Sequence, residues 1–295
     1  MAVRIGINPI TWSNDDLPEL GGETPLETCL AEAREAGYVG IELGNKFPRE
    51  SAVLRPILYR HGLALISGWY SARLLERTAA EEIRAVEPHL SLLSEMGSAV
   101  MVFAETTGSV AGERGRPLSR RPRLSEADWP RFAERLTAVA DHLVRRGVRM
   151  AYHHHMGTVV ESEAEIDRLM RSTGESVGLL LDTGHLAYAG ADPVAVAKRH
   201  IARINHVHCK DVRADVLAAM RGDDRSFLDA VVEGVFTVPG DGAVDFAAVL
   251  GVLKTAGYQG WLVVEAEQDP AKAHPLTYAR MGCRYLSGAV RAAGL

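Results

Sequence analysis

The feature that most constrains the fold of this 295-residue sequence is a regular alternation of short β-rich runs with longer amphipathic segments. Apolar residues in the longer segments recur at intervals of three and four, which is typical of helices packed on one side. The β-rich runs cover residues 3–7, 39–44, 63–68, 98–104, 148–152, 177–181, 203–208 and 261–265. Eight strands that alternate with helices predict an α/β fold of the (β/α)8 barrel type, which chains of this length commonly adopt.

Local signals place several helix ends. Residues 24–37 and 81–97 each end in a glycine, which is the preferred residue just after a helix. Ser162 is followed three residues later by Glu165, and this spacing is the capping box that predicts a helix start. The alternative fold is a doubly wound open sheet. Its nucleotide-binding version is excluded, because no GxGxxG or GxxxxGK[ST] motif follows an early strand.

We expect one barrel domain over residues 1–295, since 47% of the residues are hydrophobic and can bury a substantial core. Two connections are longer than the others, at about 105–124 after the fourth strand and 210–243 after the seventh. Loops that follow barrel strands lie at the face that carries active sites. These two segments are therefore predicted to be lids or subunit contacts.

Composition and charge exclude several classes of protein. The formal net charge is -5 with both signs interspersed, so no basic face is expected and no nucleic-acid partner is predicted. Cys29, Cys209 and Cys283 are odd in number and far apart, which indicates neither a disulfide framework nor a cysteine zinc site. No signal-peptide pattern or long apolar segment is present, so we predict a cytoplasmic protein without a membrane partner.

A histidine run, His153 to His155, stands at the end of the fifth predicted strand. In a barrel, the polar residues at the C-terminal ends of the strands converge on one mouth. Successive side chains of a strand point to opposite faces, so His153 and His155 are predicted to share one face and His154 to take the other. His154 is expected to pack rather than to take part in chemistry.

Three other strand ends supply a candidate metal site. Asp182, His208 and Glu265 form an oxygen, nitrogen and oxygen set suited to a divalent cation such as Mn²⁺, Co²⁺ or Zn²⁺. A fourth ligand is expected from the fifth strand or its loop, where the candidates are Glu161, which we favour, and His153. Any one of these residues alone is more often solvated or hydrogen-bonded, but their coincidence at successive strand ends favours a metal site.

Several longer motifs make the sequence recognisable. Residues 7–50, "AETTGSV", "YHHHMGTVVES", "LDTGHLAYAG" and "HVHCKDV" together resemble the myo-inosose-2 dehydratases of inositol catabolism, within the xylose-isomerase-like superfamily of sugar isomerases and epimerases. The resemblance runs nearly end to end. "NDDLPELGG" and "ELGNK" are specific to the dehydratases, whereas "LDTGH" and "HVHCKD" are shared more broadly.

The resemblance implies a hydro-lyase with a TIM barrel and a divalent metal, Mn²⁺ or Co²⁺ first, with Zn²⁺ or Mg²⁺ as alternatives. The implied reaction dehydrates 2-keto-myo-inositol to a trihydroxycyclohexane-1,2-dione. By the superfamily pattern Asp182, His208 and Glu265 match metal ligands. The sequence departs from the pattern at His153, where many relatives carry glutamate, so the fourth ligand stays open.

The chemistry of such a dehydration fits the residues present. Removal of a proton next to a ketone creates an enolate, and loss of the neighbouring hydroxyl then needs an acid. The candidates for proton transfer are His153, His155, His185 and Lys210, because imidazole titrates near neutral pH and a desolvated lysine near a cation can have a lowered pKa. The predicted substrate-binding residues are Trp12, Asn14, Asp15, Asn45, Lys46, Trp69, Glu105 and Asp211.

Other interpretations remain. Trp12 and Trp69 could equally be packing residues, and Arg120, Arg121 and Arg123 are expected to form a solvated run of charge. A metal-dependent isomerase or epimerase, or a related lyase, on another keto-sugar would share the enolisation step. A phosphodiesterase like the AP endonucleases, or a barrel that only senses a sugar, is a more distant alternative. Analogy with other barrels suggests a homodimer or homotetramer.

Overall fold

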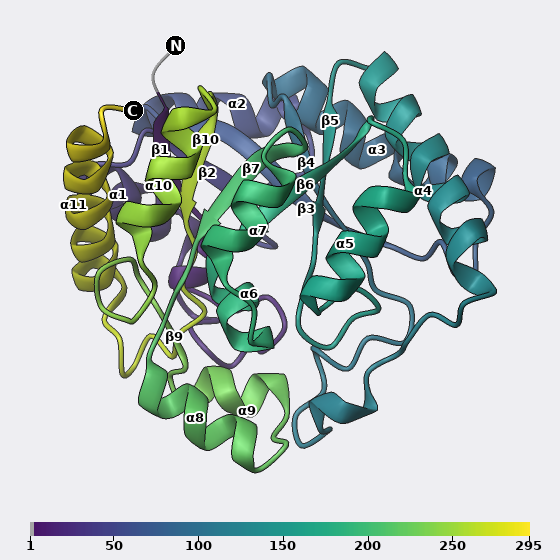
Figure 1. Ribbon diagram of the computed structural model, residues 1–295. Helices are drawn as coiled ribbons and strands as arrows, with labels where there is room; N and C mark the ends of the chain where they lie inside the picture. The colour runs from purple at the N-terminus through teal and green to yellow at the C-terminus, as the bar shows by residue number, and fades with distance from the viewer. Residues whose placement is uncertain (1–2) are drawn as a thin grey trace.

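The computed structural model describes residues 3–295, and in this range eight parallel strands close into a barrel (Figure 1). Their order around the barrel is β1, β10, β7, β6, β5, β4, β3, β2. The strands are β1 (Arg4–Ile7), β2 (Gly40–Leu43), β3 (Ala64–Ala72), β4 (Val100–Glu105), β5 (Arg149–His153), β6 (Val177–Asp182), β7 (Ile204–Cys209) and β10 (Trp261–Val264). The predicted (β/α)8 barrel is confirmed, and each strand lies within a residue or a few of its predicted position.

Helices surround the barrel (Figure 1). They are α1 (Leu26–Glu35), α2 (Ser51–His61), α3 (Ala79–Met96), α4 (Asp128–Arg145), α5 (Glu163–Ser172), α6 (Thr183–Ala189), α7 (Pro193–His200), α10 (Phe246–Thr255) and α11 (Pro275–Ala293), with short 3-10 turns η1 (Pro9–Thr11) and η2 (Leu118–Arg120). The predicted capping box starts α5: the Glu165 backbone N–H donates to Ser162 Oγ, and the Ser162 backbone N–H donates to the Glu165 carboxylate.

Strand register brings the C-terminal ends of neighbouring strands to one level. Asp182 at the end of β6 is paired directly with His208 of β7. His208 is paired in turn with Val263 of β10, two residues before Glu265. Because β6 is buried along its whole length, side chains at its end are held in a rigid frame. The barrel strands therefore position Asp182 and His208 directly, and Glu265 follows immediately after β10.

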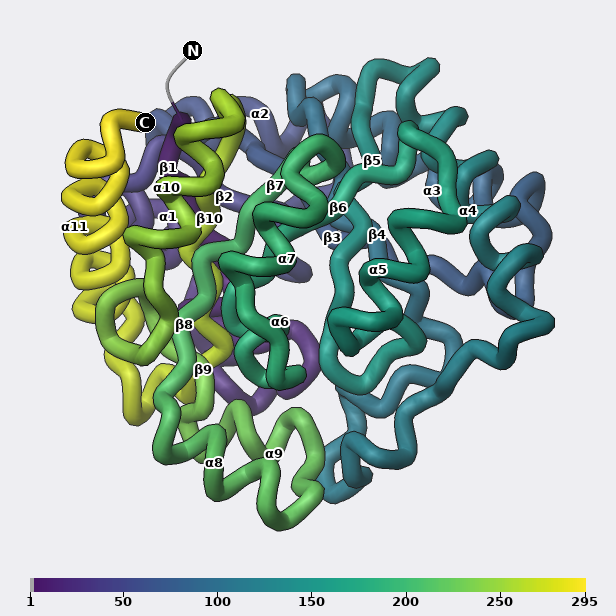
Figure 2. Tube along the Cα trace, in the orientation of Figure 1, coloured from purple at the N-terminus to yellow at the C-terminus, as the bar shows by residue number. Residues whose placement is uncertain are grey.

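The two long connections lie at the end of the barrel opposite to the chain termini (Figure 2). The second one contains β8 (Asp211–Val212), α8 (Ala214–Gly222), α9 (Phe227–Val232) and β9 (Phe236–Thr237), and β8 pairs with β9 in an antiparallel ladder. Phe227 and Phe236 are buried in a separate apolar cluster of this segment. Arg114 of the first connection pairs with Asp229 of the second at 3.2 Å, so the two connections touch.

Over residues 3–295, no helix combines the length and the apolar character needed to span a bilayer.

Candidate active site

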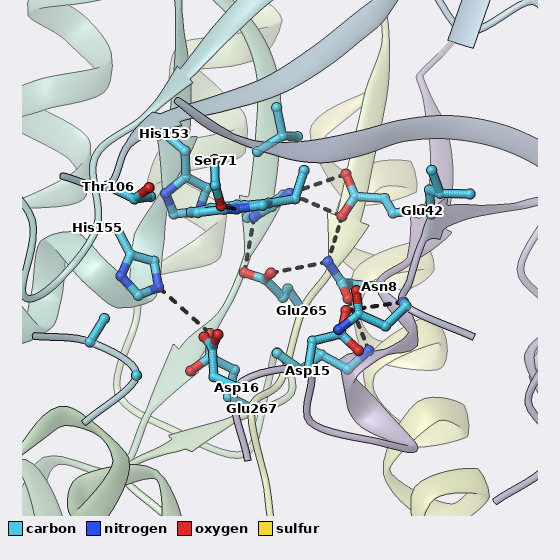
Figure 3. Close-up of a pocket in the computed structure, with 18 of the residues that line it drawn as sticks. Asn8, Asp15, Asp16, Glu42, Ser71, Thr106, His153, His155, Glu265 and Glu267 are labelled. Atoms are coloured by element: carbon cyan, nitrogen blue, oxygen red, sulfur yellow. Dashed lines mark hydrogen bonds and ion pairs between the residues drawn. The ribbon is translucent and has the colours of Figure 1, made fainter. Parts of the chain in front are cut away.

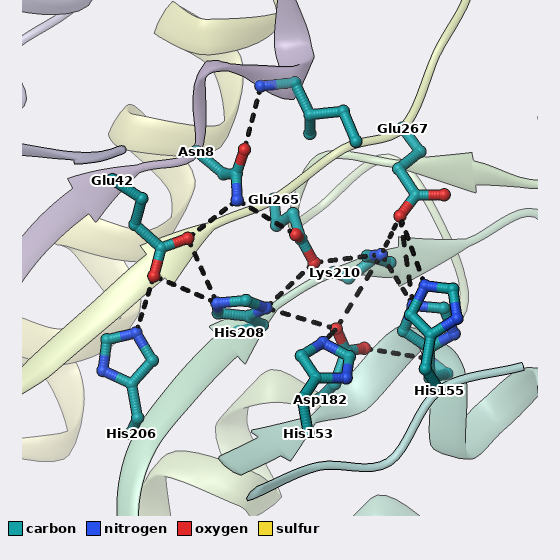
Figure 4. A network of polar contacts seen from close by, with 12 residues as sticks. Asn8, Glu42, His153, His155, Asp182, His206, His208, Lys210, Glu265 and Glu267 are labelled. Atoms are coloured by element: carbon teal, nitrogen blue, oxygen red, sulfur yellow. Dashed lines mark hydrogen bonds and ion pairs between the residues drawn. The ribbon is translucent and has the colours of Figure 1, made fainter. Parts of the chain in front are cut away.

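Four ligand-type side chains meet at the C-terminal end of the barrel (Figure 4). His153 comes from β5, Asp182 from β6, His208 from β7 and Glu265 from the residue after β10. One ligand atom of each lies within 4.8 Å of the others. The His153 Nε2 and His208 Nδ1 atoms are each 3.5 Å from Asp182 Oδ2, and His208 Nδ1 is 2.9 Å from Glu265 Oε2. We call these four residues the barrel-end cluster.

The structure does not bring Glu161, the favoured fourth ligand, to this cluster. Glu161 Oε2 accepts a hydrogen bond of 2.7 Å from the Gly157 backbone N–H, and Glu161 Oε1 lies 3.2 Å from Arg121 Nε. The carboxylate is thus held by its own loop and by a neighbouring arginine. The alternative, His153, takes the fourth position, because it is the last residue of β5 and points into the barrel end.

The prediction that Arg121 belongs to a solvated run of charge is wrong. The side chain is buried, with only 6% of its surface exposed. Its guanidinium donates to both carboxylate oxygens of Glu165 at 2.8 and 3.0 Å, and to the Thr158 carbonyl at 2.9 Å. Charge-assisted hydrogen bonds of this kind are stronger than bonds between neutral groups. Arg121 therefore ties the first long connection to the start of α5 and to the loop after β5.

A carboxylate outside the barrel-end cluster orients one of its ligands. His208 Nε2 donates to Glu42 at 3.2 Å, and Nδ1, the other ring nitrogen, faces Asp182 and Glu265. Metal-binding histidines in proteins usually show this arrangement. Although burial alone would raise the pKa of Glu42, contacts with His208 and His206 hold it well below its ordinary value. Glu42 is thus an ionised carboxylate that accepts hydrogen bonds from these two imidazoles.

Glu42, His206 and His208 also have ligand spacing, but the atoms that face one another, the Glu42 carboxylate and the two Nε2 atoms, are already paired. Glu42 accepts from Asn8 Nδ2 at 2.7 Å, from His206 Nε2 at 2.8 Å and from Ser67 Oγ. Asn8 Nδ2 also donates to Glu265 Oε1 at 3.1 Å. Glu42 and Asn8 therefore hold ligands of the barrel-end cluster in place, and this group is not a second ion site.

The barrel-end cluster contrasts with this support. Asp182 Oδ2, Glu265 Oε2 and His208 Nδ1 are buried and lack a hydrogen-bond partner of good geometry. Buried polar atoms are normally hydrogen-bonded, so three unpartnered ones that converge on one point favour a bound cation between them. Ligand distances of about 2.0–2.2 Å place two ligands of one ion up to about 4.4 Å apart, close to the spacing observed. The residues present therefore fit a divalent cation.

Next to the barrel-end cluster lies a second group around Lys210, a completely buried lysine (Figure 4). Its Nζ atom is 2.9 Å from Glu267 Oε1, 3.0 Å from Glu265 Oε2 and 3.1 Å from His185 Nε2. Burial alone would lower the pKa of Lys210, but the surrounding carboxylates raise it above its ordinary value. These carboxylates therefore stabilise the charged form of Lys210.

His155 and Glu267 lie face to face at the edge of this second group. His155 Nδ1 donates to the Met156 carbonyl at 2.8 Å, which leaves Nε2 as an acceptor 4.0 Å from Glu267 Oε1. Burial, followed by the charge on His153 and Lys210, lowers the pKa of His155 to about 3, so its imidazole is neutral near pH 7. Burial raises the pKa of Glu267 to about 7.

A cavity of about 360 Å³ opens over both groups (Figure 3), a size that suits a small molecule. The cluster side is formed by His153, His155, His208, Glu265 and Glu267. Other polar lining residues come from the loops after β1 and β2 and from the ends of β3 and β4: Asp15, Asp16, Asn45, Arg49, Ser71 and Thr106. Lys210, Asp182 and His185 lie beneath this lining and do not reach the cavity surface.

Trp69 lines the cavity as predicted, with 40% of its surface exposed. Its ring meets His153 and His155 edge to face, with centroids 5.3 and 5.7 Å apart. The indole N–H donates to Ser71 Oγ at 2.8 Å, which fixes the plane of the ring. Asp15 and Asn45 also line the cavity as predicted.

Five predicted substrate-binding residues do not line the cavity: Trp12, Asn14, Lys46, Glu105 and Asp211. Trp12 is buried in the core, where its indole N–H donates to Glu32 at 2.6 Å. Asn14 accepts from two backbone N–H groups of its own loop at 2.8 Å. The Lys46 ammonium donates to three backbone carbonyls between residues 21 and 24. Each of these polar side chains stabilises a loop.

Glu105 and Asp211 have the same structural role. Glu105 accepts from the Leu74 and Thr107 backbone N–H groups at 2.5 and 2.8 Å. Asp211 accepts from several backbone N–H groups of the connection that follows β9, among them that of Gly242 at 3.1 Å. A strand-end position alone could not reveal these roles, because they depend on where neighbouring loops turn.

Seven further residues line the cavity or support its ligands but were not predicted from the sequence: Asn8, Asp16, Glu42, Arg49, Ser71, Thr106 and Glu267. The same strand-end rule would have found Asn8, Ser71 and Thr106, since Asn8 and Thr106 directly follow a strand and Ser71 is the second-last residue of β3. The alternation that selected Glu265 also points to Glu267. Asp16 and Arg49 reach the cavity from irregular loops, and no sequence signal identifies them.

Residues 30–288 match the family model of the xylose isomerase-like TIM barrel. The chain is 57% identical over 295 residues to the rhizopine catabolism protein MocC of Rhizobium meliloti, covering 100% of this chain and 90% of MocC. It is 46% identical over 286 residues to the inosose dehydratase of Geobacillus thermodenitrificans, covering 96% of each. The crystal structure of the IolI protein with a bound zinc atom shares the fold, with a TM-score of 0.67, 16% identity and coverage of 99% and 98%. The chain therefore belongs to the xylose isomerase-like TIM barrel family, and its predicted resemblance to the inosose dehydratases is confirmed.

Proposed function

We propose that this protein is a metal-dependent inosose dehydratase that converts 2-keto-myo-inositol to a trihydroxycyclohexane-1,2-dione. The observation that carries the proposal is that the barrel-end cluster opens into a polar cavity beside two further proton-carrying groups, His155 and Glu267. The relative with 46% identity, an inosose dehydratase by name, supports the same reaction. The product follows when the α carbon loses a proton, the β carbon loses hydroxide, and the resulting enol becomes the second ketone.

The barrel-end cluster would hold the divalent cation. Two imidazoles and two carboxylates suit Mn²⁺, Co²⁺ or Zn²⁺, and we place Mn²⁺ and Co²⁺ first. When bound, such an ion would stabilise the negative charge that develops on the ketone oxygen as the α proton leaves. Asp182 lies deep in the cluster, whereas His153, His208 and Glu265 line the cavity. One side of the cluster is therefore open to substrate.

His155 and Glu267 are placed for the two proton transfers. Both line the cavity, and both are held by contacts on the side away from it. The hydrogen bond from His155 Nδ1 to Met156 orients the ring and directs the free Nε2 toward the cavity region shared with Glu267. Lys210 holds Glu267 through a bond of 2.9 Å from beneath. Together these residues can remove the α proton and protonate the leaving hydroxyl.

The remaining lining residues suit a cyclic polyol. A cyclohexanone with equatorial hydroxyls presents C–H bonds on its faces, and these can pack on the ordered indole of Trp69. Its hydroxyls radiate in the ring plane, where Asp15, Asp16, Asn45 and Arg49 supply donors and acceptors. This division into one flat apolar wall and a polar rim favours a cyclitol over an extended chain.

The proposal is tested by incubating 2-keto-myo-inositol with the protein in D₂O and following the ring protons by NMR. With Mn²⁺ present, a ring CHOH signal should disappear as the dione forms, and a chelator should stop both changes. Exchange of an α proton for deuterium without a dione would instead support the isomerase or epimerase alternative. Neither change in the presence of Mn²⁺ or Co²⁺ would refute the proposed function.

A further inference from the structure

Lys210 occupies a position that has the surroundings of a metal site. His155, His185 and Glu267 each offer a ligand atom, and these three atoms lie within 4.8 Å of one another. Two imidazoles and a carboxylate form a common ligand set for transition metals. The Lys210 Nζ atom lies against this set, 2.9 Å from Glu267 Oε1 and 3.1 Å from His185 Nε2.

We propose that the ammonium group of Lys210 fills what would otherwise be a second divalent-cation site, so that each chain binds one metal ion and not two. This inference rests on the proposed function in one respect, since it takes the barrel-end cluster as the site of the first ion. It assigns Lys210 a positioning role beneath the cavity rather than a direct contact with substrate.

The donors of Lys210 match the acceptors around it. An ammonium group has three N–H donors, and Glu267, Glu265 and His185 lie at 2.9, 3.0 and 3.1 Å. The ring of Phe236 lies 4.7 Å from Nζ and covers another side. The ammonium group thus hydrogen-bonds to Glu267 and His185 and forms an ion pair with Glu265, and all three groups would otherwise be able to bind a cation. An ion could enter this position only if the ammonium group moved out.

The stem of Lys210 is also fixed in place. A Cβ atom at Gly184 would lie 2.5 Å from the Lys210 Cγ atom, so only glycine leaves room for the lysine at this point. Thr183 Oγ1 accepts from the Lys210 backbone N–H at 3.1 Å and donates to its carbonyl at 2.7 Å. The backbone of Lys210 is therefore held by hydrogen bonds, and the start of its side chain packs closely on Gly184.

Glu265 connects the two positions. Its Oε2 atom is 2.9 Å from His208 Nδ1 in the barrel-end cluster and 3.0 Å from Lys210 Nζ. Two-metal enzymes place their ions about 3.5–4 Å apart, commonly with a carboxylate between them. Lys210 therefore stands where the second ion of such a pair would lie.

Removal of the amine should change the metal stoichiometry. Metal-free protein is dialysed against excess Co²⁺, and bound cobalt is counted by elemental analysis alongside its visible absorption. The wild type should bind one Co²⁺ per chain, and Lys210→Ala should bind two. The double variant Lys210→Ala with Glu267→Gln should return to one, because it lacks a ligand of the second position.

Further variants guard against a failure to fold. Lys210→Gln removes the charge but keeps an amide, so it should also bind two Co²⁺ if Lys210→Ala proves unstable. His185→Ala in the wild-type background should still bind one, since His185 holds no ion there. Two Co²⁺ in the wild type, or only one in a folded Lys210 variant, would overturn the inference. No Co²⁺ in the wild type would instead count against the metal-dependent function itself.

Discussion

Replacing Glu42 by glutamine should weaken metal binding although Glu42 is not a ligand. The carboxylate accepts from His208 Nε2 on one side and from Asn8 Nδ2 on the other. Whichever way the new amide turns, its NH₂ group faces a donor. Asn8 cannot simply flip, because its Oδ1 accepts the Ile10 backbone N–H at 2.9 Å. The variant also removes the negative charge that makes the His208 imidazole a stronger ligand.

Loss of such a supporting partner typically weakens metal affinity by about 10–100-fold. This corresponds to about 1.4–2.8 kcal/mol of binding free energy. The change is measured by titrating metal-free wild type and Glu42→Gln with Mn²⁺ in a calorimeter. Ser67→Ala is the matched control, because it removes one donor to Glu42 and leaves both the charge and the His208 contact. Its effect should be much smaller. A Kd for Glu42→Gln within about twofold of the wild type would refute the reasoning.

Four further predictions follow from the site and its surroundings. Asp182→Ala and Glu265→Ala should each abolish metal retention after gel filtration, and unchanged metal content by elemental analysis would remove that residue from the barrel-end cluster. His155→Ala should retain the metal and lose turnover, so full activity in a steady-state assay would return His155 to a packing role. Arg121→Ala should lower the free energy of unfolding, measured in urea, by about 1–3 kcal/mol, because it removes the partner of two partly buried carboxylates; a change below about 0.5 kcal/mol would show that these contacts contribute little. Although burial alone would raise the pKa of Glu165, hydrogen bonds from Ser162 and Arg121 lower it, so its stabilising effect should be present above its ordinary pKa and be lost as the pH falls through the lowered value. The free energy of unfolding of the wild type and of Arg121→Ala should be measured between pH 6 and 3, about the ordinary carboxyl range. The difference between the two proteins should become smaller toward the acidic end, and a constant difference would contradict this linkage.

The barrel was predictable because its signals are local and repeated. Most of the β-rich runs are mainly apolar, and each is followed by a segment with helical periodicity. The alternation of side chains along a strand then separated His153 and His155 from His154. In the structure His154 Nε2 lies against the backbone of the neighbouring strand, 3.4 Å from the Asp182 nitrogen, and away from the cavity.

Residues outside the strands were harder to place. Glu161 and Arg121 look like a ligand and a surface charge in the sequence, but they pair with each other across two loops at 3.2 Å. Trp12 and Lys46 satisfy groups that become close only after the chain has folded. Polar side chains in loops often form hydrogen bonds with backbone groups that have no partner in a helix or sheet. Sequence position alone could not separate this use from contact with a substrate.

The most direct test of metal-dependent dehydration is a titration of metal-free protein with Mn²⁺ while dione formation from 2-keto-myo-inositol is measured. We expect no activity without metal, a linear rise as Mn²⁺ is added, and a break at one equivalent per chain. Full dehydratase activity in protein shown by elemental analysis to be metal-free would contradict the central claim.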